Sequence, residues 1–280
     1  MPSSGCCRTR PRIPPARWWT WPAAADMPQR GSLFLWHGRA LVVGPGIDSS
    51  PHAHFAMQLT FGIDKPFRVR LGKEGAWTET RAALFAPNQA HQLDCRDSLL
   101  AHIFVELPQR QKTLASQVEA GYERQPAFAP VAAAIDAARH GALDIDAAEG
   151  ALQQWLACAL PSASTPAGYD ERIGKALAWI AAHPAEACTG AQLAERVHLS
   201  ESRFTHLFCQ QTGLPLTRYL LWTRLLDAVA AVARGENMTQ AAHRAGFADL
   251  AHMSRSFRAT FGVVPSELHK MTIAFKPPGG

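Results

Sequence analysis

The spacing of apolar residues changes along this chain, from short runs in its first part to helical periodicity in its second. Within residues 32–107, the apolar runs are separated by breaks rich in Gly, Pro and Asp, such as Gly44-Pro45-Gly46. The runs lie at residues 33–36, 41–43, 55–61, 67–71, 83–85 and 99–105. Many short strands with regular turns are typical of a β-sandwich or a small barrel.

After Pro108 the apolar residues follow a helical period, which predicts helices at 109–124, 129–140 and 146–160. In the last of these, an apolar stripe is formed by Leu152, Trp155, Leu156 and Ala159. The stripe has two interpretations: it packs on the β-domain of its own chain, or it forms a contact between two chains. The sequence leaves both open.

A short pattern occurs twice between residues 189 and 265. The first copy runs from Leu193 to Ser200 and continues as a helical pattern to Gly213, and the second runs from Ala241 to Ala248 and continues to Gly262. Two successive helix-turn-helix units at matched spacing are most simply explained as a DNA-binding module.

The turn and cap signals agree with this pattern. Gly246 is suited to a positive φ at the end of the helix that starts near Thr239. Ser200 and Asp249 are expected to cap the helices that follow them, and Thr189 with Gln192 forms the sequence signature of a capping box.

The second helix of each unit is expected to contact DNA, because a helix fits the major groove and its outward side chains reach base edges. The residues expected to contact DNA are Ser202, Arg203, Thr205 and His206 in the first unit, and Ala251, Ser254, Arg255 and Arg258 in the second. Arg255 is the leading base reader, since its planar guanidinium can pair with both acceptors of guanine. The alternative for either helix is a solvated surface that only packing holds in place.

With these residues the chain resembles the AraC/XylS family of bacterial transcription regulators over residues 170–272. The residues that carry the resemblance are Leu193, Ala194, Ser200, Phe204, Phe208, Gly213, Tyr219, Arg224 and Ala228, then Ala241, Ala242, Gly246, Phe247, Asp249, Ser254, Arg255, Phe257, Arg258, Phe261, Gly262, Pro265 and Ser266. The resemblance implies two reading helices in successive major grooves, with residues 215–235 as the rigid spacer. It also implies promoter DNA and RNA polymerase as partners, transcriptional activation and a homodimer.

The first domain resembles the cupin-like sensor domain that many regulators of this family carry, through His52-Ala53-His54 and a later Pro87-to-His91 segment. Three histidines that converge in such a barrel would form a metal site, for which the resemblance implies a glutamate as fourth ligand. This chain has Gln58 there, although Glu106 or Cys95 could substitute. We therefore expect no metal ion and no cofactor, and either an effector pocket at His52, His54, Gln58 and His91 or histidines with a structural role only.

Charge and cysteine content add little to this interpretation. The formal net charge is +5, but four arginines belong to a Pro- and Trp-rich leader, residues 1–26, which we expect to be disordered. Met27 is an alternative start of translation. The six cysteines show no disulfide-framework spacing, and no apolar run reaches membrane-spanning length, so a cytoplasmic protein without a membrane partner is expected.

The sequence thus predicts an α+β protein of two domains: a cupin-like β-barrel with trailing helices, then an all-α domain with two helix-turn-helix units. The expected boundaries are 27–108 for the barrel, 109–160 for a helical dimerisation segment, 161–169 for a linker, 170–272 for the DNA-binding domain and 273–280 for a tail. The predicted function is a DNA-binding regulator, not an enzyme, that senses a small-molecule effector. The alternatives are a metal-dependent cupin enzyme with an accessory DNA-binding module and a DNA binder that needs no effector.

Overall fold

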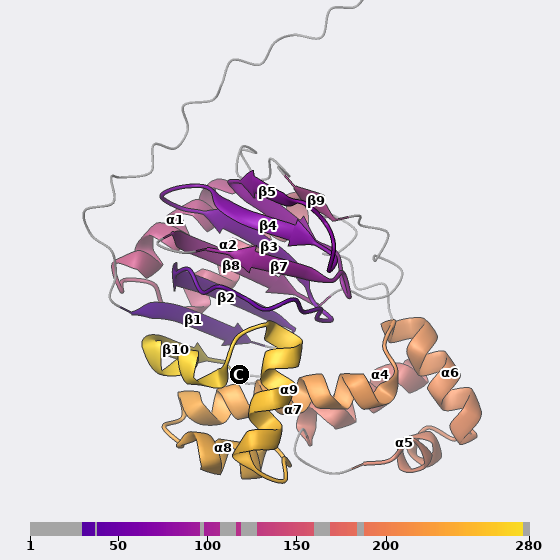
Figure 1. Ribbon diagram of the computed structural model, residues 1–280. Coiled ribbons are helices and arrows are strands. Elements are labelled where there is room, and N and C mark those ends of the chain that lie inside the picture. Colours follow the sequence, from indigo (N-terminus) through magenta and orange to yellow (C-terminus); the bar gives the residue numbers. More distant parts are fainter. Residues whose placement is uncertain are drawn as a thin grey trace, which may run out of the picture.

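The computed structural model describes residues 30–276 except 37, 96–97, 107–115, 119–127, 160–168 and 184–187. The expected leader and most of the expected linker therefore lie outside the described residues. A β-domain with two helices forms one part of the molecule, and a helical domain forms the other (Figure 1). The α+β architecture in two domains, expected from the change in hydrophobic periodicity, is confirmed.

Two sheets make up the β-domain. The larger sheet has the strand order β10-β1-β2-β8-β3-β6-β9, and the smaller has the order β5-β4-β7. The strands are β1 (Gly31–Trp36), β2 (Arg39–Pro45), β3 (Met57–Gly62), β4 (Phe67–Leu71), β5 (Trp77–Thr80), β6 (Ala82–Phe85), β7 (His91–Asp94), β8 (Leu99–Val105), β9 (Gln117–Val118) and β10 (Met271–Phe275). All neighbours pair antiparallel except β1 and β10, which are parallel. The described strands form two open sheets of cupin-like character, not one closed barrel.

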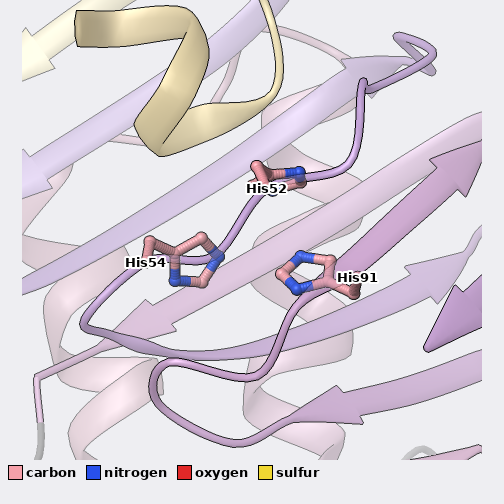
Figure 2. Close-up of side chains that lie close together, drawn as sticks. All are labelled: His52, His54 and His91. Carbon is pink, nitrogen blue, oxygen red and sulfur yellow. The ribbon is translucent and has the colours of Figure 1, made fainter. Parts of the chain in front are cut away.

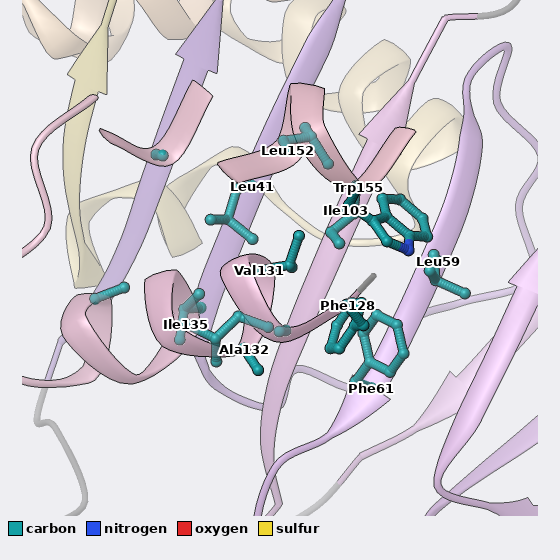
Figure 3. Close-up of a cluster of buried hydrophobic side chains, with 14 of the residues drawn as sticks. Leu41, Leu59, Phe61, Ile103, Phe128, Val131, Ala132, Ile135, Leu152 and Trp155 are labelled. Atoms are coloured by element: carbon teal, nitrogen blue, oxygen red, sulfur yellow. The ribbon is translucent and has the colours of Figure 1, made fainter. Parts of the chain in front are cut away.

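Helices α1 (Ala129–Arg139) and α2 (Ile145–Ala159) cover one face of the larger sheet, where they form its main hydrophobic core. Phe61 from the sheet packs on Phe128 with ring centroids 4.6 Å apart, and Phe128 meets Trp155 edge-on at 5.9 Å (Figure 3). Leu152, Trp155 and Leu156 are all buried in this core. Of the two interpretations of the α2 stripe, packing on the chain's own β-domain is therefore the one observed.

The helical domain contains α4 (Glu171–Ala182), α5 (Gly190–Arg196), α6 (Glu201–Thr212), α7 (Leu216–Ala233), α8 (Met238–Arg244), α9 (Leu250–Phe261) and the 3-10 helix η4 (Pro265–Lys270). The capping box of Thr189 and Gln192 is present, and Ser200 and Asp249 cap α6 and α9 as expected. A second capping box, formed by Asn237 and Gln240 at the start of α8, was not predicted. Within the described residues, none of the helices is both long and apolar enough to cross a membrane.

Two elements differ from the sequence-based expectation. Residues 273–275, expected in a tail, belong to β10, which pairs in parallel with β1 and so joins the helical domain to the sheet. Lys276 follows the strand and forms ion pairs with Asp146 and Glu149 of α2, at 2.7 and 2.9 Å. The helix predicted at 109–124 is wrong at Gln117–Val118, because these residues pair with β6 as strand β9. The rest of that range lies almost wholly outside the described residues.

Candidate functional site

Each of the two helix-turn-helix units is held by its own apolar contacts. In the first unit, Leu193 and Ala194 of α5 are buried together with Phe204 and Phe208 of α6. In the second unit, the corresponding buried residues are Ala242 of α8 and Met253 and Phe257 of α9. These residues form the packed faces of α6 and α9, which leaves the opposite faces to solvent.

Both units use the same backbone turn, although different residues form it. Gly246 has φ +75° in the second unit, as expected, and His198 has φ +54° at the matching position of the first. The amide of Leu199 donates to the carbonyl of Ala194, and that of Phe247 donates to the carbonyl of Ala242. A left-handed conformation is strained for a residue with a side chain. The sequence pattern gave no signal that His198 would adopt it.

The residues expected to contact DNA lie on the free faces of α6 and α9. Ser202, Arg203 and His206 are exposed on α6, and Ala251, Arg255 and Arg258 are exposed on α9. Ser254 is partly buried, as is Thr205, whose hydroxyl lies within hydrogen-bond distance of the carbonyls of Glu201 and Ser202. The arginines of α9 are thus free to reach a partner, whereas the Thr205 hydroxyl proton is used within its own helix.

Helix α7 connects the two units. It is 18 residues long, which corresponds to about 27 Å at a rise of about 1.5 Å per residue. Its residues Tyr219 and Trp222 pack with the first unit, and Leu225 and Val229 pack with the second. Because one uninterrupted helix contributes to both cores, it fixes the relative placement of α6 and α9.

A cavity of about 640 Å³ lies between the larger sheet and the helical domain. Its walls are mainly apolar and come from both domains: Leu33, Leu35 and Val42 from the sheet, and Leu226, Val229 and Phe257 from the helices. Its polar lining includes the predicted effector residues His52, His54 and Gln58 but not His91, together with His102, Glu106 and charged side chains such as Arg39 and Lys270. The helical wall was not predicted, because residues so far apart in the sequence carry no local sign that they share a cavity.

The histidines predicted to line an effector pocket do meet in space. His52, His54 and His91 are buried, and each offers a ring nitrogen within 4.8 Å of those of the other two (Figure 2). The segment before β3 carries His52 and His54, while His91 begins β7 and pairs with His52 through an isolated backbone bridge. The Gln58 Oε1 lies 2.7 Å from the Nε2 of His54 and 3.2 Å from that of His91.

Burial disfavours the protonated form of the rings in this cluster. Burial lowers the pKa of His52 to about 4, with a further lowering from His54. Burial also lowers the pKa of His54, and it lowers that of His91 well below the usual range, where His54 and His52 add to the effect. A neutral imidazole keeps one N–H group and offers a lone pair on its other ring nitrogen.

Hydrogen bonds link this region directly to the helical domain. The Nε1 of Trp222 donates a hydrogen bond of 2.5 Å to the Oε1 of Glu106. The carbonyl of Gly262, at the C-terminal cap of α9, accepts from both the backbone amide and the hydroxyl of Ser50, at 2.8 and 3.0 Å. The segment with two of the cluster's histidines is thus also the segment that holds the end of α9.

Comparison with known proteins identifies the helical domain. Residues 193–271 match the family described as "Helix-turn-helix domain". The chain is 34% identical over 105 residues to the HTH-type transcriptional activator RhaS of Citrobacter koseri, covering 37% of this chain and 38% of that protein. It is 35% identical over 102 residues to RhaS of Escherichia fergusonii, covering 36% and 37%. These matches span little more than a third of each relative.

Solved structures of similar fold extend over both domains. ToxT K231A from Vibrio cholerae, without ligand, superimposes with a TM-score of 0.58 at 10% identity, covering 83% of this chain and 97% of ToxT. ToxT bound to (E)-4-(8-methylnaphthalen-1-yl)but-3-enoic acid gives a TM-score of 0.56 at 11% identity, covering 86% and 98%. At this identity the likeness concerns the fold alone. Over residues 193–271 the chain is thus similar to helix-turn-helix transcription regulators such as RhaS, in agreement with the resemblance of this domain to the AraC/XylS family.

Proposed function

We propose that this chain is a sequence-specific DNA-binding transcription regulator whose activity depends on an effector bound between its two domains. The observation that carries the proposal is the pair of helix-turn-helix units, each with a packed face and a free polar face, held at fixed spacing by α7. A single helix pair would leave a solvated surface as the simpler explanation, but two units in one rigid arrangement suit two successive turns of a DNA groove.

The proposed DNA contacts are those expected from the sequence. Arg255 and Arg258 are exposed on α9, so Arg255 reads a base and Arg258 binds phosphate in this proposal. On α6, Ser202, Arg203 and His206 supply the polar contacts. Thr205 contributes through its methyl group or as a hydrogen-bond acceptor, since its proton is used within the helix.

The proposed effector site is the interdomain cavity. A volume of about 640 Å³ and a mainly apolar wall suit a small, largely apolar molecule. Similar ToxT chains have been solved with a naphthalenyl butenoic acid and with an unsaturated fatty acid. Both domains line the cavity, so an occupant that fits only one of their relative positions would shift the equilibrium between them.

The proposal also includes the direction of regulation, the partner on DNA and the assembly. RhaS is named a transcriptional activator, which supports activation by this chain. RNA polymerase as the partner on DNA is part of the proposal because the sequence resemblance implies it. A homodimer is the proposed assembly. Because the α2 stripe is buried within its own chain, we place the contact between copies elsewhere on the surface.

The test is DNA binding by the full chain, measured by fluorescence anisotropy over a salt series on DNA from upstream of its own and adjacent genes. Arg255→Ala should lose about 1–3 kcal/mol of binding to the specific site and little to random DNA. Arg255→Lys should retain charge yet lose discrimination, because an ammonium lacks the planar fork. Arg68→Ala is the matched control, since Arg68 is an equally charged, exposed residue of β4 in the β-domain.

The outcomes separate the candidate functions. Specific binding that Arg255→Ala weakens and Arg68→Ala does not would support the proposal. Equal loss in the two variants would mean that only net charge matters, and so would contradict base reading by Arg255. Specific binding that no cavity occupant changes would favour a DNA binder without an effector.

A further inference from the structure

The three buried histidines use the same ring nitrogen, Nδ1, for a backbone hydrogen bond, which leaves the Nε2 atom of each for another partner. The Nδ1 atoms of His52, His54 and His91 lie 2.9 Å from the backbone carbonyls of Ser50, Ala56 and Gln89, respectively. A carbonyl oxygen can only accept, so each Nδ1 must carry the hydrogen. The Nε2 atom of each neutral ring is then a lone-pair donor, and these atoms are left to meet one another.

The side chain that completes the cluster is also an electron-pair donor. The Gln58 Oε1 faces the Nε2 atoms of His54 and His91, while the Gln58 Nε2 donates to the Thr60 Oγ1 at 2.9 Å. Lone pairs on nitrogen and oxygen therefore face one another in a buried space. Lone pairs that face one another repel, whereas a cation between them would be bound by each of them.

The dimensions suit a transition-metal ion. Metal–nitrogen bonds of about 2.0–2.1 Å place two tetrahedral nitrogen ligands about 3.4 Å apart. The ring nitrogens here lie within 4.8 Å of one another, so small rotations of the rings would close the site. Hydrogen bonds from Nδ1 to backbone carbonyls are the usual way in which proteins orient metal-binding imidazoles.

The same segment of chain reaches α9. The ring of His52 is bonded to the carbonyl of Ser50, and the amide and hydroxyl of Ser50 both donate to the carbonyl of Gly262. A Cβ placed on Gly262 would lie 2.5 Å from the Nδ1 of His52, so the ring and the cap of α9 are in close contact. In Figure 2, the helical segment in yellow passes directly beside His52.

We propose that His52, His54 and His91 bind a divalent transition-metal ion through Nε2, with the Gln58 Oε1 as oxygen ligand, and that the bound ion sets the position of α9. Three imidazoles and an amide oxygen favour ions such as Zn²⁺, Co²⁺ or Ni²⁺ over Mg²⁺ or Ca²⁺. This departs from the sequence-based expectation of a metal-free pocket. The coupling to α9 rests on the proposed function in DNA binding, whereas the metal site does not.

The metal site is tested by titrating the full, metal-free chain with Co²⁺, whose visible absorption reports nitrogen ligands and coordination geometry. We expect one ion per chain and a spectrum of a nitrogen-rich site. His54→Ala should weaken binding by at least about a hundredfold, the upper end of the effect of altering a metal ligand's surroundings. His140→Ala is the control, because His140 also bonds its Nδ1 to a backbone carbonyl but is exposed and outside the cluster.

Gln58→Glu distinguishes a metal site from a hydrogen-bonded cluster. If the Gln58 amide were rotated by 180°, its NH2 group would donate to His54 and His91, and no cation would be needed. A glutamate has no such hydrogens to offer but binds a cation more strongly, so Gln58→Glu should raise Co²⁺ affinity at least about tenfold. Unchanged or weaker affinity in this variant would overturn the assignment of Gln58 as a ligand. If His54→Ala does not fold, His91→Asn replaces it.

The coupling is tested by hydrogen exchange with and without Co²⁺, followed by DNA binding in the same two states. We expect slower exchange in residues 49–54 and in α9 when the ion is bound, and altered DNA affinity, with both effects absent in His54→Ala. Metal binding that leaves α9 exchange and DNA affinity unchanged would overturn the coupling but not the site. Retention of Co²⁺ binding by His54→Ala would overturn the site itself. Absence of specific DNA binding in both states would count against the proposed function alone, since the Co²⁺ titration does not depend on DNA.

Discussion

Replacement of Gly262 by alanine should break the contact between the end of α9 and the β-domain. Gly262 has φ +74°, and a Cβ there would lie 2.5 Å from the His52 Nδ1, 2.8 Å from the Ser49 Cβ and 2.8 Å from the Ser50 carbonyl oxygen. All three distances are shorter than a carbon atom tolerates, and the Ser50 oxygen belongs to the backbone. The two hydrogen bonds from Ser50 to the Gly262 carbonyl should therefore be lost.

The magnitude follows from two contributions. The left-handed conformation destabilises an alanine by about 1–2 kcal/mol relative to an unstrained one. Loss of two hydrogen bonds adds about 1–3 kcal/mol, at about 0.5–1.5 kcal/mol each. Gly141→Ala isolates the first contribution, because Gly141 has φ +68° and no atom within 4 Å of its added Cβ.

The assay is urea unfolding of both variants, together with hydrogen exchange of the Ser50 amide. Gly262→Ala should lower the free energy of unfolding by about 1–3 kcal/mol more than Gly141→Ala, with the difference assigned to the two hydrogen bonds. Only Gly262→Ala should speed exchange at Ser50. Equal destabilisation by the two variants, with the Ser50 amide still protected, would refute the reasoning, because the contact would then contribute nothing beyond backbone strain.

Two further predictions concern single residues. In a thermal melting assay, His198→Gly should stabilise the chain by about 0.5–1 kcal/mol. The substitution removes a left-handed strain of about 1–2 kcal/mol, but the greater entropy of the unfolded chain offsets about 0.4–1 kcal/mol of this gain. The control His243→Gly, in the last turn of α8, should instead destabilise the chain. Burial, aided by Asp48 and Asp94, raises the pKa of the Cys95 thiol to about 12, whereas Cys209 is exposed. Iodoacetamide at pH 8 should therefore modify Cys209 and spare Cys95 in the native protein, as peptide mass spectrometry would show; rapid modification of Cys95 would contradict its burial.

Local features of the helical domain could be predicted because their causes lie within a few residues. The capping box of Thr189 and Gln192, for example, needs only residues that are three positions apart. The left-handed conformation of His198 could not be predicted, because its side chain gives no preference for it and the packing of α5 on α6 imposes the turn. The sequence suggested a glycine turn only where a glycine was present, at Gly246.

Features that depend on distant residues were less accessible. The pair of His52 and His54 could be found from its spacing, but its convergence with His91 depends on a backbone bridge between β7 and the segment before β3. The pairing of β10 with β1 joins residues at opposite ends of the described chain, and nothing local distinguishes β10 from an apolar tail. The sequence therefore supplied candidate residues, while topology decided which of them lie close together.

The parallel pairing of β10 with β1 has a consequence for the movement of the helical domain. The helical domain is attached to the β-domain at two points. The chain enters the helical domain before α4, and after η4 it returns to the larger sheet as β10, where Lys276 forms ion pairs with α2. Attachment at two points allows rotation about the line that joins them but resists separation. In the proposed function, an occupant of the cavity would therefore reorient the helical domain as a whole without releasing it from the sheet.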